Sequence, residues 1–266
     1  MSEVRRKLNQ KQVAILHLIY RFRFVTTELT ALYQGGKDAK TVYPRLQTLA
    51  EQGYIGRRYE SHYRLEHRPA AYFLLPDGLR VLRSQPKEGY TYDEKALHNI
   101  RRDQTATDQF IARSLDVLHA YCLLREQYGD KLQFFTKNDL AAYDHFPRSL
   151  LDAYLRLEVG GETKQYFLTI HQQDVPFYLH VRRIKQYADY ADAGTWEVTE
   201  TRLPDILALC DTTLVQKRLT KRIAKENHPD LHFYLAAKDT LKNLAANTHI
   251  WHLADEPETA MSLEGE

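Results

Sequence analysis

The sequence predicts an α+β protein in two parts, a winged helix-turn-helix followed by an α/β domain with a mixed sheet. Three observations lead to this prediction. Up to about residue 90, helical periodicity gives way to two short extended runs, which is the element order of a winged helix. Beyond residue 93, a hairpin precedes alternating helices and short apolar strands, a pattern typical of a mixed sheet. A chain of 266 residues is long enough for two such domains.

The first helices follow from the spacing of apolar residues. A helix is predicted over residues 10–23 with Asn9 as its cap, because apolar side chains recur there every three or four residues. A second, short helix ends at Gly35, since glycine accepts the left-handed backbone of a helix end. A third helix is predicted over residues 37–52. Pro44 lies inside it and predicts either a kink or a later start.

After the third helix the periodicity changes from helical to extended. Residues 54–59 and 70–75 are compatible with strands, and the polar, basic segment 60–69 between them predicts a hairpin with a long tip. Pro76 then opens a short helix. Residues 86–92 are the predicted linker, so the winged helix-turn-helix is expected over residues 1–88.

The second part, predicted over residues 93–253, begins with a long helix at 93–128. Gly160 and Gly161 indicate a tight hairpin between two strands. The two hairpin strands are predicted at 150–159 and 165–171, and further strands at 132–136, 206–210, 231–236 and 250–253. Helices are predicted at 176–193, 212–227 and 238–244. Residues 254–266 contain five acidic residues and no basic ones, which predicts a flexible acidic tail.

Charge is divided unevenly along the chain. The net charge is +2, yet residues 1–90 contain 16 Lys and Arg against 8 Asp and Glu, and the remainder contains 21 against 27. The near-neutral total excludes a uniformly basic nucleic-acid coat and a polyacidic disordered chain. The basic excess near the N-terminus indicates that this part alone meets a polyanion.

The two cysteines, Cys122 and Cys210, lie too far apart in the sequence for a metal or redox motif, which favours a reducing cytoplasm. The N-terminus is charged, unlike a signal peptide, and no apolar run approaches the ~20 residues of a membrane span. We therefore expect a cytoplasmic protein without a membrane partner.

In a winged helix, the third helix enters the major groove of DNA and the hairpin tip contacts phosphate or the minor groove. Polar and basic residues are concentrated in these two places. The predicted DNA-binding residues are Lys37, Lys40, Thr41, Tyr43 and Arg45 on the helix, and Arg57, Arg58, Arg64, His67 and Arg68 on or beside the hairpin. A merely solvated face, or a surface that docks a protein, remains an alternative.

Leu49–Ile55 and Ala71–Gly78, with the hairpin between them, resemble the general winged-helix pattern shared by many bacterial regulators. Taken with the second part, the chain to about Leu253 resembles the replication-relaxation family, whose members are associated with conjugative and mobilisable plasmids and integrative elements. The segments that carry this match are His98, Leu151–Tyr154, Tyr166–His171, Ile184–Tyr187 and Leu203–Leu209. The resemblance implies an N-terminal winged helix, a second domain similar to restriction-endonuclease-like folds, and a role in replication or transfer of a mobile element.

The resemblance also implies a divalent-metal site, which this sequence does not complete. An endonuclease-like fold needs two acids on adjacent strands to hold the metal, with a lysine nearby. The resemblance puts the first acid at Asp152. It puts a Glu-x-Asp pair on the second strand, where this chain has Thr169, Ile170 and His171. With Lys185 as the lysine, these positions are vestigial, and no metal and no cofactor are expected.

The sequence therefore predicts a non-enzymatic accessory protein that binds double-stranded DNA. Its nuclease-like domain would serve DNA grip, dimerisation, or docking of a replication or conjugation protein. Two alternatives stay open. One is a metal-dependent nuclease in which Glu158 or Asp174 replaces the missing acid. The other is a winged-helix transcriptional regulator whose second domain senses a ligand.

Overall fold

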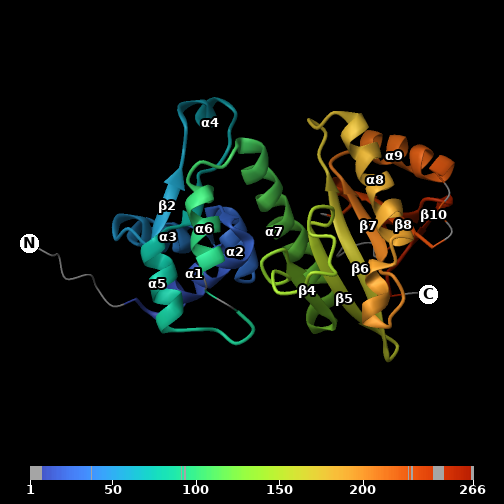
Figure 1. Ribbon diagram of the computed structural model, residues 1–266. Helices are drawn as coiled ribbons and strands as arrows, with labels where there is room; N and C mark the ends of the chain where they lie inside the picture. The colour runs from blue at the N-terminus through green and yellow to red at the C-terminus, as the bar shows by residue number, and fades with distance from the viewer. Residues whose placement is uncertain are drawn as a thin grey trace, which may run out of the picture. The chain divides into compact units, whose positions relative to one another are not determined.

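The computed structural model describes residues 8–36, 38–90, 92, 94–226, 228, 230–241 and 249–264. The chain forms two compact units, residues 1–122 and residues 123–266. In Figure 1 the first unit is mostly helical, in blue to green, and the second contains a large sheet, in green to red. Among the described residues, no helix combines the length and the apolar character needed to cross a membrane.

The first unit contains the elements predicted for a winged helix-turn-helix, in the predicted order. They are α1 (Gln10–Phe22), β1 (Phe24–Val25), α2 (Thr27–Tyr33), α3 (Ala39–Glu51), β2 (Ile55–Arg58), α4 (Ser61–Leu65), β3 (Ala71–Leu74) and α5 (Pro76–Ser84). The strands pair antiparallel in the order β1-β3-β2. Two of these elements were not predicted from the sequence: β1, and α4, a single turn of helix inside the predicted loop 60–69.

Local interactions explain where the first helices begin and end. The Asn9 side chain accepts a hydrogen bond from the Gln12 backbone at 2.9 Å, and the Gln12 side chain accepts one from Asn9 at 3.0 Å, which closes a capping box. Gly35 follows α2 with a φ of +89°. Asp38 caps α3, so this helix starts later than the predicted residue 37. Pro44 lies inside α3 on its exposed side, where water can satisfy the backbone carbonyl that loses its partner.

The predicted long helix over 93–128 is two helices, α6 (Glu94–Asp103) and α7 (Asp108–Tyr128), separated by a short turn. Ile111 of α7 is buried in one cluster with Phe24, Ala71 and Phe73 of the small sheet. Because α6 and the start of α7 pack on this sheet, the first unit extends to Cys122. This boundary differs from the predicted domain limits of 1–88 and 93–253, since apolar contacts continue past the linker.

The second unit is built on a seven-stranded mixed sheet with the order β10-β9-β8-β7-β6-β5-β4. Its elements are β4 (Leu132–Thr136), β5 (Ala153–Val159), β6 (Glu162–His171), α8 (Phe177–Asp192), β7 (Asp205–Cys210), α9 (Thr213–Glu226), β8 (Phe233–Ala237), α10 (Lys238–Leu241), β9 (Trp251–Leu253) and β10 (Glu256–Met261). Strands β6, β7 and β8 run parallel and the other pairs antiparallel. The predicted mixed sheet is confirmed.

Helices α8 and α9 cover one face of this sheet (Figure 1). Ile184 and Tyr187 of α8 share a buried cluster with Leu219 of α9 and with Phe167 and Ala208 of the strands. These helices are the crossovers between parallel strands, and they bury the side chains of β7 that point to this face of the sheet.

The predicted flexible tail over 254–266 is wrong for most of its length. Residues 256–261 form β10, which pairs antiparallel with β9 at the edge of the sheet. Leu263 is buried, its carbonyl accepts a hydrogen bond from Lys164 Nζ at 3.0 Å, and Glu264 pairs with Lys131 at 2.8 Å. These acidic residues can belong to an ordered segment because exposed charges are compatible with an edge strand. Lys131 in addition neutralises the carboxylate of Glu264.

Candidate nucleic-acid interface

Helix α3 has one buried face and one polar, exposed face. Val42, Leu46 and Leu49 are completely buried. The opposite face carries four of the predicted DNA-binding residues. Lys40, Thr41 and Tyr43 are exposed, and Arg45 is half-buried. Lys37 lies outside the described residues. The buried apolar stripe fixes the helix on its unit and leaves its polar face available to a ligand.

Strand β2 continues this surface into the hairpin. Arg57 is exposed, and its guanidinium lies over the ring of Tyr59, 4.9 Å from the ring centre. Arg58 is different, because its Nε lies 2.9 Å from Glu60 and its Nη1 donates to the carbonyl of Gln104 at 3.2 Å. The two adjacent arginines therefore have different roles, Arg57 facing solvent and Arg58 holding the hairpin.

The hairpin tip is held by a carboxylate at the start of α7. Tyr63 of α4 is buried, and its hydroxyl donates to Asp108 Oδ1 at 2.7 Å. The other carboxylate oxygen lies 2.9 Å from Arg68 Nη1 and 3.1 Å from His62 Nε2. The hydrogen bond from Tyr63, followed by those from His62 and Arg68, lowers the pKa of Asp108 to about 2. We name Tyr63, Arg68, His62 and Asp108 the wing clamp, because the hairpin that they hold is the wing of the predicted winged helix.

The wing clamp separates the predicted DNA-binding residues of the tip into one that it binds and two that stay exposed. Arg68 is committed to Asp108 and to the face of the Tyr63 ring, 4.1 Å away. Arg64 and His67 are exposed. The sequence analysis missed Asp108 and Tyr63, and no signal pointed to them, because residues 45 positions apart carry no local pattern.

Acid is expected to release the hairpin tip. The pKa of Asp108 is lowered from its usual 3.8 to about 2, so its stabilising effect is complete above pH 3.8 and is lost as the pH falls through about 2. Amide hydrogen exchange of residues 60–69, corrected for the intrinsic rate, should therefore rise between about pH 4 and pH 2. Asp108→Asn should show raised exchange already at neutral pH and little further change in acid. Equal protection in the variant and the wild type would contradict the clamp.

The second unit brings two of the four vestigial residues together. Asp152, 3 % exposed, accepts a hydrogen bond from the backbone of Ile170 at 2.7 Å. Arg183 Nη1 lies 3.7 Å from the same carboxylate and donates to Thr169 Oγ1 at 3.2 Å. Lys137 Nζ lies 3.9 Å from the other oxygen of Asp152. Two cations of the protein itself thus lie beside this carboxylate.

His171 is engaged with a second histidine. Its Nδ1 lies 3.0 Å from Nδ1 of His180, and His180 Nε2 lies 3.1 Å from the carbonyl of Gln172. Since a carbonyl only accepts, His180 carries a proton on Nε2. Both rings are buried. Each Nδ1 is used for this contact, which leaves neither atom for a metal.

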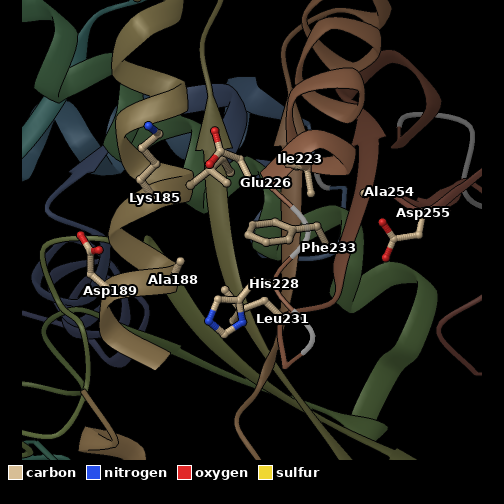
Figure 2. Close-up of a pocket in the computed structure, with 11 residues that line it drawn as sticks. Lys185, Ala188, Asp189, Ile223, Glu226, His228, Leu231, Phe233, Ala254 and Asp255 are labelled. Atoms are coloured by element: carbon tan, nitrogen blue, oxygen red, sulfur yellow. The ribbon is translucent and has the colours of Figure 1, made fainter. Parts of the chain in front are cut away.

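Lys185 does not lie with Asp152 and Thr169. It is exposed on α8 and lines a hollow of about 240 Å³ together with Asp189, Glu226 and His228. Figure 2 shows the ring of Phe233 between α8, which carries Lys185 and Asp189, and α9, which carries Ile223. Arg183, two positions earlier, provides the cation beside Asp152 instead.

The residues present do not fit a divalent-metal site. One buried carboxylate meets a threonine hydroxyl and two cations, whereas Mg²⁺ requires several oxygen ligands and a net negative site. The proposed replacements do not correct this: Glu158 lies at the far end of β5 from Asp152 and accepts from Thr163, and Asp174 is exposed. Across the described part of the chain, no group of three or more His, Cys, Asp or Glu could hold a metal ion.

Comparison with known proteins gives a family and a distant structural likeness. The model of a family described as replication-relaxation matches residues 16–206. No curated protein matches the sequence. Among solved structures, the restriction endonuclease FokI is similar at a TM-score of 0.32 and 12 % identity, over 96 % of this chain and 45 % of that one. The chain thus spans less than half of that enzyme, and a likeness at this TM-score supports no argument about activity.

Proposed function

This chain belongs to the replication-relaxation family, and on that basis we propose that it is an accessory protein that binds double-stranded DNA during replication or transfer of a mobile element. The observation that carries the proposal is the presence in one unit of an exposed polar face on α3 and a basic, anchored hairpin, here called the wing. A rigid helix with polar side chains suits the major groove, and a basic wing beside it suits the phosphates.

Four cations have the exposure that phosphate contact requires. Lys40 and Arg45 lie on α3, and Arg57 and Arg64 lie on the wing. Arg58 and Arg68 are excluded from this set because acidic partners hold them within the unit. Each cation that neutralises a phosphate releases counterions, so binding should be steeply salt-dependent and mostly independent of sequence.

We propose that the second unit is not catalytic and serves DNA grip, dimerisation or docking of a replication or conjugation protein. The support is the charge around Asp152, where Arg183 and Lys137 already neutralise the single carboxylate. A supercoiled plasmid incubated with Mg²⁺ or Mn²⁺ should stay intact. Nicking by the wild type that disappears in Asp152→Ala would instead establish a nuclease.

Removing two exposed cations of the wing is expected to weaken DNA binding uniformly. For Arg57→Ala with Arg64→Ala, the slope of log affinity against log salt should become less steep by about two, one for each phosphate contact. Fluorescence anisotropy of a labelled duplex over a salt series measures both quantities. The matched control is Arg80→Ala, an exposed arginine of α5 paired with Asp77, which should change neither.

The result distinguishes three cases. No binding by the wild type, or equal affinity and slope in the double variant, would reject the proposed interface. One sequence bound far more tightly than random duplex would favour the transcriptional regulator instead.

A further inference from the structure

We propose that the wing inserts Leu65 into the minor groove and bends the duplex. The inference rests on the proposed DNA binding and goes beyond it, because binding alone requires neither an apolar wedge nor a bend. Proteins that bend DNA from the minor groove commonly wedge an apolar side chain such as Leu between base steps and partly unstack them.

Leu65 is the last residue of α4 and is 83 % exposed. Tyr63, two positions earlier on the same turn of helix, is completely buried against the unit. The single turn of α4 therefore has one side chain that anchors it and one that projects into solvent. A single exposed leucine is common on protein surfaces, and Leu65 is distinguished by how it is held and by the charges that surround it.

The segment that carries Leu65 is rigidly held. After α4, the Arg68 backbone donates to the carbonyl of Tyr63 at 2.8 Å, and His67 adopts a φ of +53° to close the helix end. A non-glycine residue in this region costs free energy, which the surrounding contacts must offset. The wing clamp fixes the same segment from below through Asp108. Leu65 thus loses little freedom on binding, which favours insertion.

The charge around Leu65 fits the minor groove. The acids of the wing are engaged with bases of the wing: Glu60 with Arg58 at 2.9 Å, and Glu66 with Arg68 at 3.3 Å. Arg64, adjacent to Leu65, is exposed and pairs with no acid among the described residues. The minor groove has a negative potential that attracts inserted arginines. An apolar tip beside an arginine therefore matches DNA better than it matches an apolar protein surface.

The bend is measured by energy transfer between dyes at the two ends of a short duplex. The wild type should shorten the end-to-end distance, since apolar wedges kink DNA by roughly 20–90°. Leu65→Ala should remove most of this change, and Leu65→Met should keep it. Because no phosphate contact is lost, the salt slope of the alanine variant should equal that of the wild type. Leu214→Ala, an exposed leucine of α9, is the matched control.

The outcomes separate the two proposals. No binding by the wild type rejects the proposed function, and the wedge with it. Binding without a bend, or an equal bend in Leu65→Ala, overturns the wedge and leaves the DNA-binding function standing. In that second case, Leu65 would be assigned to a contact with another protein.

Discussion

Replacing Arg183 by methionine should lower the free energy of unfolding of the second unit by about 3 kcal/mol. Arg183 lies beside the buried carboxylate of Asp152 and also donates to Thr169. Lys137, the other cation beside Asp152, lies farther away at 3.9 Å and is half-exposed, so it compensates poorly for the loss of Arg183. Removing one partner of a buried ion pair is costly because it leaves the other charge desolvated.

Tryptophan fluorescence during urea unfolding measures this effect in the right unit. The chain has two tryptophans, Trp196 and Trp251, and both lie in the second unit. The double variant Arg183→Met with Asp152→Asn should recover most of the lost stability, since it removes both charges together. Arg182→Met, an exposed neighbour on α8, should be nearly neutral. A loss below about 1 kcal/mol for Arg183→Met would show that Asp152 does not depend on it.

This ion pair bears directly on the proposed function. In an endonuclease-like site, the charge of the acidic ligands is balanced by the metal. Here the guanidinium of Arg183 balances Asp152, and the neighbouring strand offers the hydroxyl of Thr169. Thr169 and Arg183 are mutually consistent, because a second carboxylate without a metal would repel Asp152 and a guanidinium beside Thr169 would repel a metal.

The fold was predictable where periodicity and turn residues agree. The start of α1 at its cap, the Gly160-Gly161 hairpin and the mixed sheet all follow from local patterns. The extent of the first unit did not follow, because the contacts of Ile111 with the small sheet join residues far apart in the sequence. The order of the acidic C-terminal segment was also missed, since charge alone suggested flexibility and strand pairing prevailed.

The candidate site was predictable only in outline. The exposed residues of α3 follow from its 3.6-residue period, which also gives the buried residues. The distinction between Arg57 and Arg58 does not, because it depends on whether a partner such as Gln104 lies within reach. In the same way, Lys185 was the expected cation beside Asp152 and Arg183 is the observed one. Two positions along a helix turn a side chain by about 200°, so only the packing of α8 decides which residue points inward.

The second large effect is expected at Arg23, in the first unit. Arg23 Nε donates to both carboxylate oxygens of Asp103, at 2.9 and 3.2 Å, and Nη2 donates to the carbonyl of Asn99 at 3.2 Å. Asp103 is 4 % exposed. Arg23→Met should therefore cost about 3 kcal/mol and free α6 from α1. Amide exchange of α1 and α6, followed by mass spectrometry, localises the effect, and Arg80→Met on α5 is the exposed control.

Two substitutions of Arg23 separate the effect of the ion pair on stability from the effect of the backbone conformation. Arg23 caps α1 with a φ of +71°, a conformation that favours glycine. Arg23→Gly loses the same ion pair as Arg23→Met but relieves the backbone, so it should be the less destabilising of the two by about 1 kcal/mol. Adding Asp103→Asn to either variant should recover stability, because the buried charge is then removed as well. If the glycine variant were instead as stable as the wild type, backbone strain and not the ion pair would govern this corner of the first unit.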